Sequence, residues 1–388
     1  MNVNHTMSPV RKAVLGLLAP LIYTSSVMAT ENSVESAPNA SVSPYIINGS
    51  PTTDTELTNT YPTFTSLYFH DGSKFVNYCG GTVIDGQYVL TAAHCVYGSY
   101  AWMLNTWVVP GMADQTKYDN GGYQSARVEK IYYPNNYNEN LDPSQGDVLP
   151  NDIAILKLKT ALNVRDYSSL LNSTFDNTYA LNRGKDTFKA VGRGLTSHIT
   201  DDQGKTVSRT ATNVVNQASL TFDATNSCNS TDKQLCFDGV VFDGYKNSTC
   251  NGDSGGPVYW WDGSSYQQIG ITSYGPGTCG SLAERYTSVF TEIYDYAGWI
   301  GRVVSGTENA TFEVRSTPSS RVLVRVSNGE TVDSSTALLD ETSMPKISLS
   351  GSSNSSASTG SSGGGVSFGL LGMLMLFAGF RKFTGFRK

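Results

Sequence analysis

The stretch Thr249-Cys-Asn-Gly-Asp-Ser-Gly-Gly-Pro257 holds the residue types that surround a reactive serine. Ser254 is the candidate nucleophile, because a serine hydroxyl needs a base to take its proton and donors to hold the oxyanion it creates. Gly252, Gly255 and Gly256 allow a tight turn that exposes this serine. The same turn can aim the backbone N–H groups of Gly252 and Ser254 at one point. Asp-Ser-Gly alone is equally consistent with an ordinary surface turn, so the argument depends on the other motifs.

Two upstream motifs complete a pattern that resembles the chymotrypsin-like (trypsin-fold) serine proteases. Leu90-Thr-Ala-Ala-His-Cys95 is similar to the family's histidine motif, and Asn151-Asp-Ile-Ala-Ile-Leu-Lys-Leu158 is similar to its aspartate motif. The order histidine, aspartate, serine is that of chymotrypsin, and it differs from the order in subtilisin and in the α/β hydrolases. The resemblance covers about Ile46 to Gly306.

The resemblance implies a catalytic triad. His94 would act as general base toward Ser254, and Asp152 would orient the imidazole and stabilise its charged form. A lone histidine is more often a surface or core residue, and His70 and His198 lie in polar stretches without a motif. Asp152 starts an apolar run, where a carboxylate needs a partner.

The start of the matching region resembles the N-terminus that family zymogens release on cleavage. Its sequence is Ile46-Ile-Asn-Gly49, preceded by Tyr45, where many family zymogens carry Arg or Lys. The resemblance implies that the freed Ile46 ammonium pairs with Asp253 and turns the Gly252 N–H into the oxyanion hole. An activating protease, or the enzyme itself, would make the cut.

The resemblance also places the substrate-binding residues. Ser248 stands at the floor of the S1 pocket, where a serine cannot balance a buried Arg or Lys. Gly275 leaves the pocket entrance open and Ser288 narrows its wall, which predicts cleavage after Tyr, Phe, Leu or Met. Ser273-Tyr-Gly275 resembles the edge that pairs antiparallel with a substrate peptide, and Tyr274 stands where the family commonly has Trp.

The six cysteines favour disulfides over a metal site, because their count is even and an export signal precedes them. Fifteen pairings are open from the sequence alone. The resemblance implies Cys79 with Cys95, Cys228 with Cys236, and Cys250 with Cys279. The spacings typical of structural zinc are absent from the sequence, so we expect no metal and no cofactor.

Composition and patterning fit an all-β fold. The chain has 22 Tyr and 38 Gly, and only 15% of its residues are charged. Short β-type runs at residues 63–69, 81–90 and 153–158 are separated by turn residues. With the resemblance, they predict two six-stranded antiparallel β-barrels with the site between them and a C-terminal helix over 291–300. A net charge of −6, without a basic run before the C-terminus, argues against a nucleic-acid partner.

The ends of the chain carry other signals. Residues 1–29 are typical of a secretory signal peptide, 30–45 of a propeptide, and 46–306 form the protease domain. Alternating runs predict a small β appendage at 307–349, followed by a Ser/Gly linker at 350–365. Residues 366–388 are apolar with a basic end and resemble the GlyGly-type sorting tails of secreted bacterial proteins. A permanent inner-membrane anchor is the alternative.

Together these features predict a secreted or cell-surface serine endopeptidase, exported through the periplasm as a zymogen. It would act on proteins or peptides as a monomer, and export machinery would process its tail. The alternative is a catalytically silent binding protein displayed on the surface, but silent members usually lose a triad residue and this chain keeps all three. A membrane structural protein has support only from the tail.

Overall fold

The computed structural model describes residues 46–70, 75–138, 141, 148–167, 188–201, 203–223, 225, 227–228, 230–317 and 320–335. The predicted signal peptide, propeptide, Ser/Gly linker and hydrophobic tail lie outside these ranges, and so does the end of the predicted appendage. Within the ranges, no helix has the length and apolar character needed to span a bilayer.

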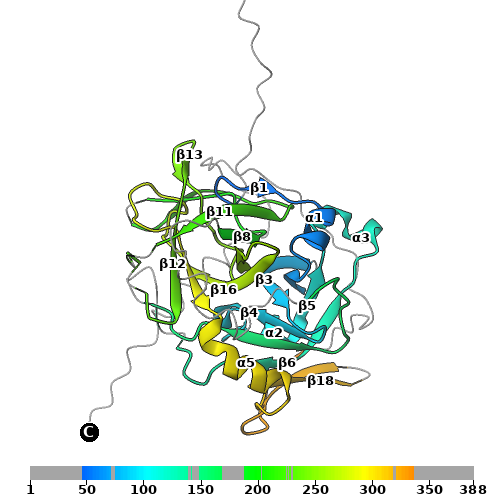
Figure 1. The fold of residues 1–388 in the computed structure, drawn as a ribbon. Helices are drawn as coiled ribbons and strands as arrows, with labels where there is room; N and C mark the ends of the chain where they lie inside the picture. Colours follow the sequence, from blue (N-terminus) through cyan, green and yellow to red (C-terminus); the bar gives the residue numbers. More distant parts are fainter. Residues whose placement is uncertain are drawn as a thin grey trace, which may run out of the picture. The chain divides into compact units, whose positions relative to one another are not determined.

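Six antiparallel strands close the N-terminal barrel (Figure 1). They follow the order β2-β3-β4-β7-β6-β5, and β5 pairs back with β2. Apolar residues of these strands, such as Leu67, Leu90 and Ile155, are fully buried in one core cluster. The strands are β2 (Phe64–His70), β3 (Phe75–Val83), β4 (Tyr88–Thr91), β5 (Thr106–Pro110), β6 (Ala126–Tyr132) and β7 (Ala154–Leu158).

Six further strands close the C-terminal barrel, in the order β8-β11-β12-β17-β16-β15 with β15 pairing back to β8. Its interior is aromatic: Phe237 packs edge-on against Phe188 and Phe290, with ring centroids 5.0 and 5.2 Å apart. The predicted fold of two six-stranded barrels is confirmed. The strands are β8 (Phe188–Gly192), β11 (Asn216–Phe222), β12 (Gln234–Gly239), β15 (Pro257–Trp261), β16 (Tyr266–Tyr274) and β17 (Ser288–Glu292).

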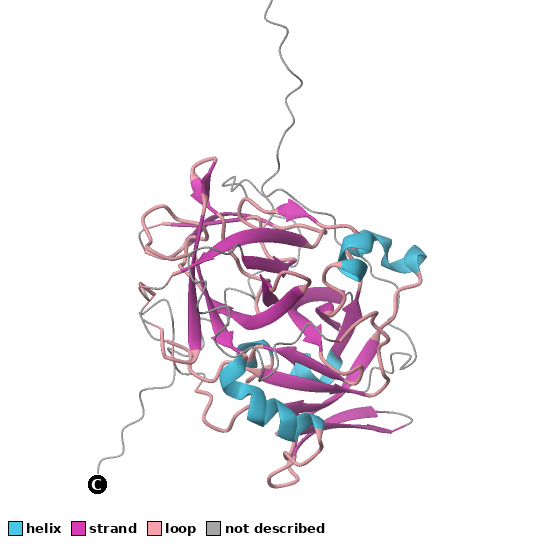
Figure 2. Ribbon diagram, viewed as in Figure 1, coloured by secondary structure: helices cyan, strands magenta, loops and turns pink. Residues whose placement is uncertain are grey.

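In the part of the chain that the structure describes, helices are few and short, as Figure 2 shows. The C-terminal helix α5 (Ala297–Val304) begins later than predicted, because Thr291 and Glu292 still belong to strand β17 and pair with β16. From α5, Ile300 and Val303 pack into the core cluster of the N-terminal barrel. The other helices are α1 (Asp54–Asn59), α2 (Tyr100–Asn105) and α3 (Tyr118–Gly121), with 3₁₀ turns η1 (Ala93–Cys95), η2 (Gln115–Lys117) and η5 (Tyr294–Tyr296).

The segment after α5 extends the N-terminal barrel's sheet. Strand β18 (Phe312–Thr317) pairs with β6, where Phe312 lies opposite Ile131. Strands β19 (Ser320–Arg325) and β20 (Thr331–Ser335) then continue outward. The sequence predicted two strands here, and the structure adds a third and joins all three to the barrel.

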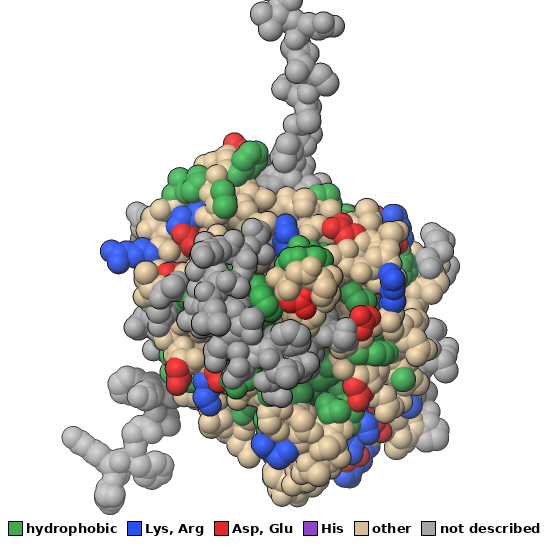
Figure 3. Space-filling view, viewed as in Figure 1, with side chains coloured by type: hydrophobic (Ala, Val, Ile, Leu, Met, Phe, Trp, Pro, Cys, Tyr) green, Lys and Arg blue, Asp and Glu red, His purple; other side chains and the backbone are tan. Residues whose placement is uncertain are grey.

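The start of the described chain is tied to the C-terminal half. Strand β1 (Ser50–Pro51) pairs with β11, and the Asn48 side chain donates to Phe242 O and Tyr245 O at 2.7 and 2.8 Å. These oxygens belong to the hairpin β13 (Val241–Phe242) and β14 (Tyr245–Lys246). The hairpin exposes apolar side chains, visible over β13 in Figure 3. A second hairpin joins β9 (Ser197–Thr200) and β10 (Thr206–Thr210).

Candidate active site

His94 and Asp152 meet at the ends of neighbouring strands. His94 lies on η1 just after β4, Asp152 lies just before β7, and the two strands pair at Thr91 and Ala154. Asp152 accepts two hydrogen bonds from the histidine, one from Nδ1 at 2.8 Å and one from its backbone N–H at 2.9 Å. The carboxylate therefore holds both the ring and the turn that carries it.

A third donor completes the surroundings of Asp152. The Ser273 hydroxyl donates to Oδ2 at 2.5 Å, and the Thr291 hydroxyl donates to the backbone oxygen of Asp152 at 2.8 Å. Both donors come from the C-terminal barrel, on β16 and β17. The catalytic pair predicted from the N-terminal barrel is thus fastened by the other barrel.

The pKa values of the pair follow from this geometry. Burial by itself would lower the pKa of His94, but the charge of Asp152 and the hydrogen bond to it outweigh burial and raise that pKa. Burial would raise the pKa of Asp152, and the charge of His94 with the hydrogen bonds from His94 and Ser273 lowers it instead. Asp152 is fully buried and the histidine side chain is 27% exposed, so the ring is open to substrate while its partner is not.

Asn151 helps to position the neighbouring Asp152, although no role was predicted for it from the sequence. Its backbone is in the left-handed region, with φ of +62°, which Asn tolerates better than most residues. Its side-chain oxygen accepts a hydrogen bond from the Tyr296 hydroxyl at 3.1 Å. The signal available in the sequence was its place beside the predicted aspartate.

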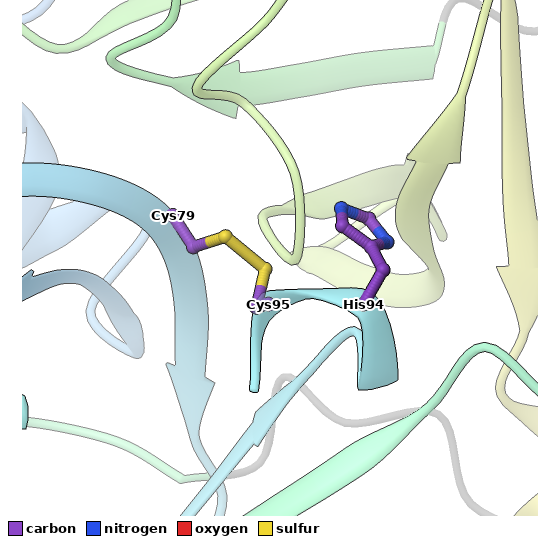
Figure 4. Close-up of side chains that lie close together, drawn as sticks. All are labelled: Cys79, His94 and Cys95. Atoms are coloured by element: carbon purple, nitrogen blue, oxygen red, sulfur yellow. A yellow bond between two sulfur atoms is a disulfide. The ribbon is translucent and has the colours of Figure 1, made fainter. Parts of the chain in front are cut away.

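Ser254 is held by backbone contacts to the strands that lead to His94. Gly80 N donates to Ser254 O at 2.8 Å, and the neighbouring Cys79 is disulfide-bonded to Cys95, next to His94. Figure 4 shows the imidazole on the same short turn as Cys95, pointing away from the disulfide. Within the described residues no hydrogen bond joins Ser254 Oγ to His94, a bond that is often long without substrate.

Gly255 permits this close approach. Its φ is +74°, and a Cβ there would collide with the Thr91 hydroxyl and lie 3.1 Å from Ala92 N. Only a residue without a side chain brings Ser254 this close to the turn of His94.

The predicted oxyanion hole has two available donors. Gly252 adopts a φ of +98°, which glycine alone reaches easily. Within the described residues, the N–H groups of Gly252 and Ser254 donate no hydrogen bond, whereas Gly255 N and Gly256 N donate to Thr272 O and Asp253 O at 2.9 Å. The turn therefore uses the amides of Asp253, Gly255 and Gly256 and leaves the two predicted donors open.

Asp253 is buried beneath this turn. Its carboxylate accepts from Gly194 N at 2.7 Å and from Cys250 N at 2.9 Å. A Cβ on Gly192 or Gly194 would collide with it, so the Gly-Arg-Gly segment is shaped around the carboxylate. Burial outweighs the two hydrogen bonds and raises the pKa of Asp253 to about 7.

Ile46, the predicted partner of Asp253, is fully buried with a φ of +30°. In the uncut sequence its nitrogen belongs to the peptide bond with Tyr45, so it carries no charge. The next residue, Ile47, forms an antiparallel bridge with Ser248 at the predicted pocket floor. The start of the predicted protease domain thus lies against the pocket.

The predicted pocket residues form a network of buried hydroxyl groups. Ser248 Oγ lies 2.6 Å from Thr249 O and 3.1 Å from Thr287 O. Ser288 Oγ accepts from Thr249 N at 3.1 Å and from Thr249 Oγ1 at 2.8 Å. Thr249 was not assigned a role from sequence, although it is adjacent to Ser248. The described floor is therefore neutral and internally hydrogen-bonded.

Gly275 and Tyr274 lie at the side of this network. A Cβ on Gly275 would meet Thr287 O at 2.8 Å. Tyr274 packs with Tyr286 against the disulfide of Cys228 and Cys236. The aromatic wall predicted from the sequence is thus backed by a disulfide.

All three disulfides join the pairs that the resemblance implied, and such bonds are typical of exported proteins. Two groups of His and Cys lie close enough together to suggest a metal site. They are Cys79, His94 and Cys95, and His198, Cys250 and Cys279. Each includes both sulfurs of a disulfide, which are not the thiolates that bind a metal.

Comparison with known families decides the identity of the domain. The sequence model of the Trypsin family matches residues 46–300, most of the described part of the chain. The chain belongs to the trypsin family. This membership supports a serine endopeptidase and matches the resemblance drawn from the three motifs.

Relatives in this family come from insects and mammals. The chain is 30% identical over 236 residues to "CLIP domain-containing serine protease HP8" of Bombyx mori, a match covering 58% of this chain and 60% of that protein. It is 31% identical over 255 residues to "Chymotrypsin-like elastase family member 1" of Canis lupus familiaris, covering 64% of this chain and 89% of the relative. These animal relatives do not support the predicted bacterial origin or its sorting tail.

Proposed function

We propose that the protein is a secreted serine endopeptidase that cleaves peptide bonds through an acyl-enzyme on Ser254. The observation that carries the proposal is the buried Asp152 carboxylate, hydrogen-bonded to His94 Nδ1 at 2.8 Å in a chain of the trypsin family. This bond places the proton on Nδ1 and leaves Nε2 free to accept one from the serine.

The chemistry follows the triad. His94 takes the hydroxyl proton as Ser254 attacks the peptide carbonyl, and the N–H groups of Gly252 and Ser254 stabilise the oxyanion. The imidazolium, stabilised by Asp152, then gives its proton to the leaving amine. Water repeats the sequence on the acyl-enzyme and restores the serine.

We infer a preference for large apolar P1 residues from the neutral pocket floor. Ser248 and Ser288 carry no charge, and their hydroxyl groups are engaged with Thr249 and the backbone. A P1 cation would be buried there without a partner, whereas burying an aromatic ring carries no such desolvation penalty. Tyr45, which precedes Ile46, is a residue that such a pocket would accept.

We further propose that the chain is a zymogen cut between Tyr45 and Ile46, either by itself or by another protease. The buried Asp253 supports this, because within the described ranges two backbone amides are its only hydrogen-bond donors and no cation pairs with it. Three disulfides support export to an oxidising compartment. Retention or removal of residues 366–388 can be measured by mass spectrometry of the secreted protein.

The test is hydrolysis of two matched chromogenic peptides, one ending in Phe and one in Arg, by the processed protein. We expect turnover of the Phe peptide, with loss of at least about 10⁴-fold in the Ser254→Ala variant. Preference for Arg would contradict the assignment of the pocket and leave the enzyme class intact. No turnover of any P1 residue by a folded, processed protein would favour the silent binding protein instead.

A further inference from the structure

A second set of buried charged and polar groups lies outside the proposed active site, on the N-terminal barrel. Arg127 on β6 and Trp107 on β5 are direct partners in the sheet, and the guanidinium carbon lies 5.0 Å from the centre of the indole ring. Arg127 is 1% exposed and Trp107 is not exposed at all. A cationic side chain is rarely buried this far without a partner.

The nitrogen atoms of these side chains are donors without acceptors. Within the described part of the chain, Arg127 Nε, Nη1 and Nη2 and Trp107 Nε1 are all buried and make no hydrogen bond. Contact with the indole face compensates part of the cation's desolvation, but it leaves the in-plane N–H groups unused. Buried donors without acceptors are unfavourable, and charged ones more so.

The surrounding charges do not supply an acceptor. Glu129, on the same strand, pairs with Lys157 at 3.8 Å, and Glu313 on β18 pairs with Arg315 at 3.4 Å. Burial lowers the pKa of Arg127 to about 10. The site thus has an excess of positive charge.

A second buried arginine lies nearby. Arg321 on β19 is 3% exposed, and its hydrogen bonds include those to oxygens of Leu104, Val128 and Ser316. Burial lowers its pKa to about 9, and the nearby positive charge of Arg127 contributes to the shift. A cavity of about 340 Å³ lies beside Arg321 and the residue that follows Arg127 on β6, and its lining includes Val128, Glu129, Lys159 and Glu313. Lys159 N also donates to Arg127 O at 2.9 Å.

We propose that Arg127 and Trp107 form a binding site for a small oxyanion of the sulfate or phosphate type. Such an ion offers several acceptor oxygens, so it can take charge-assisted hydrogen bonds from the guanidinium and one from the indole N–H. The bound ion would stabilise the part of the barrel where β6 meets the added strands β18 and β19. This site does not depend on the proposed peptidase activity.

The test follows the indole N–H of Trp107 by NMR in ¹⁵N-labelled Ser254→Ala protein. The Trp107→Phe variant assigns the resonance, because it removes the donor and keeps an aromatic ring. Sodium sulfate and sodium phosphate are titrated in turn, each against sodium chloride of equal ionic strength. We expect the Trp107 resonance to shift and saturate with sulfate or phosphate and to respond at least about tenfold more weakly to chloride.

Two variants give the comparison. Arg127→Met should abolish the saturable shift, whereas Arg209→Met, at an exposed position on β10, should bind like the parent. An equal, unsaturated drift in the parent and in Arg127→Met would overturn the proposal. If Arg127→Met does not fold, crystals of the parent soaked in selenate, an isostere of sulfate with an anomalous signal, provide the decision. Anomalous density at the guanidinium and indole nitrogens supports the site, and its absence there overturns it.

Discussion

Two buried aspartates, Asp152 and Asp253, lie in the proposed active site, and they differ in the groups that balance their negative charge. Asp152 accepts hydrogen bonds from His94 and Ser273, and its pKa is lowered. Asp253 is buried as deeply, and among the described residues it accepts from two backbone amides; burial raises its pKa to about 7. In the part of the chain that the structure describes, Asp152 thus has the His94 imidazole as its partner, whereas Asp253 pairs with no cation.

The two aspartates therefore differ in whether they need cleavage of the chain. The His94–Asp152 pair forms when the two barrels fold, because the hydrogen-bond donors to Asp152 come from both barrels. The turn that carries the proposed oxyanion donors lies over Asp253, whose proposed partner, the Ile46 ammonium, exists only after cleavage. We therefore expect the uncut protein to have an ordered His94–Asp152 pair and a Gly252–Ser254 turn whose buried carboxylate has no cation beside it.

The largest effect is expected from Asp152→Asn in the processed enzyme. The amide keeps the shape of the carboxylate but favours the wrong histidine tautomer and does not stabilise the imidazolium. We expect kcat/KM for the Phe peptide to fall by about 10⁴-fold. A fall of less than tenfold in a folded variant would mean that His94 does not depend on this carboxylate.

Asp253→Asn should give the next largest effect, and only after cleavage. Without the carboxylate the Ile46 ammonium loses its partner and the Gly252 N–H loses its position. Loss of one oxyanion donor costs about 10² to 10³-fold in kcat. In the uncut chain the same change removes an unpaired buried charge, so it should leave the free energy of unfolding unchanged or raise it at neutral pH. A marked loss of stability there would show that Asp253 already has a cationic partner.

The smallest effect concerns the pH dependence of stability in the uncut Ser254→Ala protein. The pKa of Asp253 is about 7 in the folded chain, against 3.8 for an ordinary aspartate, so between these pH values the folded state binds a proton that the unfolded state does not. The contribution of Asp253 to the free energy of unfolding is therefore largest below about pH 4, and it is lost as the pH rises to 7. Denaturant unfolding should show a loss of about 2 kcal/mol between pH 5 and pH 7.

The Asp253→Asn variant is the control for that measurement. Burial also raises the pKa of Glu292 to about 7, so this residue contributes a similar slope in both proteins. Only the difference between them reports on Asp253. Identical slopes would contradict its raised pKa.

The sequence predicted the fold where it is encoded locally, since the two barrels follow from short strands with turn residues between them. His94, Asp152 and Ser254 each sit in a short motif, so a triad could be predicted from the sequence, and the roles of these residues stay predictions. The helix was placed too early because Thr291 and Glu292 fit either a helix or a strand, and only the ladder with β16 and β12 decides.

Features that depend on pairing between distant residues could not be predicted. Nothing near Phe312 indicates that it will lie opposite Ile131 on β6. Trp107 and Arg127 come into contact only because β5 and β6 pair. In the hydroxyl network around Ser248, the resemblance implied Ser288 but not Thr249 or the backbone oxygen of Thr287.

The most direct test of the comparison is the pKa of the Asp253 carboxyl, measured before and after cleavage. ¹³C-labelled aspartate in the Ser254→Ala protein gives the titration, and Asp253→Asn assigns it. The account predicts a pKa of about 7 in the uncut chain and a value well below the ordinary range of aspartate once Ile46 is freed. The same pKa in both forms, or a low value before the cut, would contradict it.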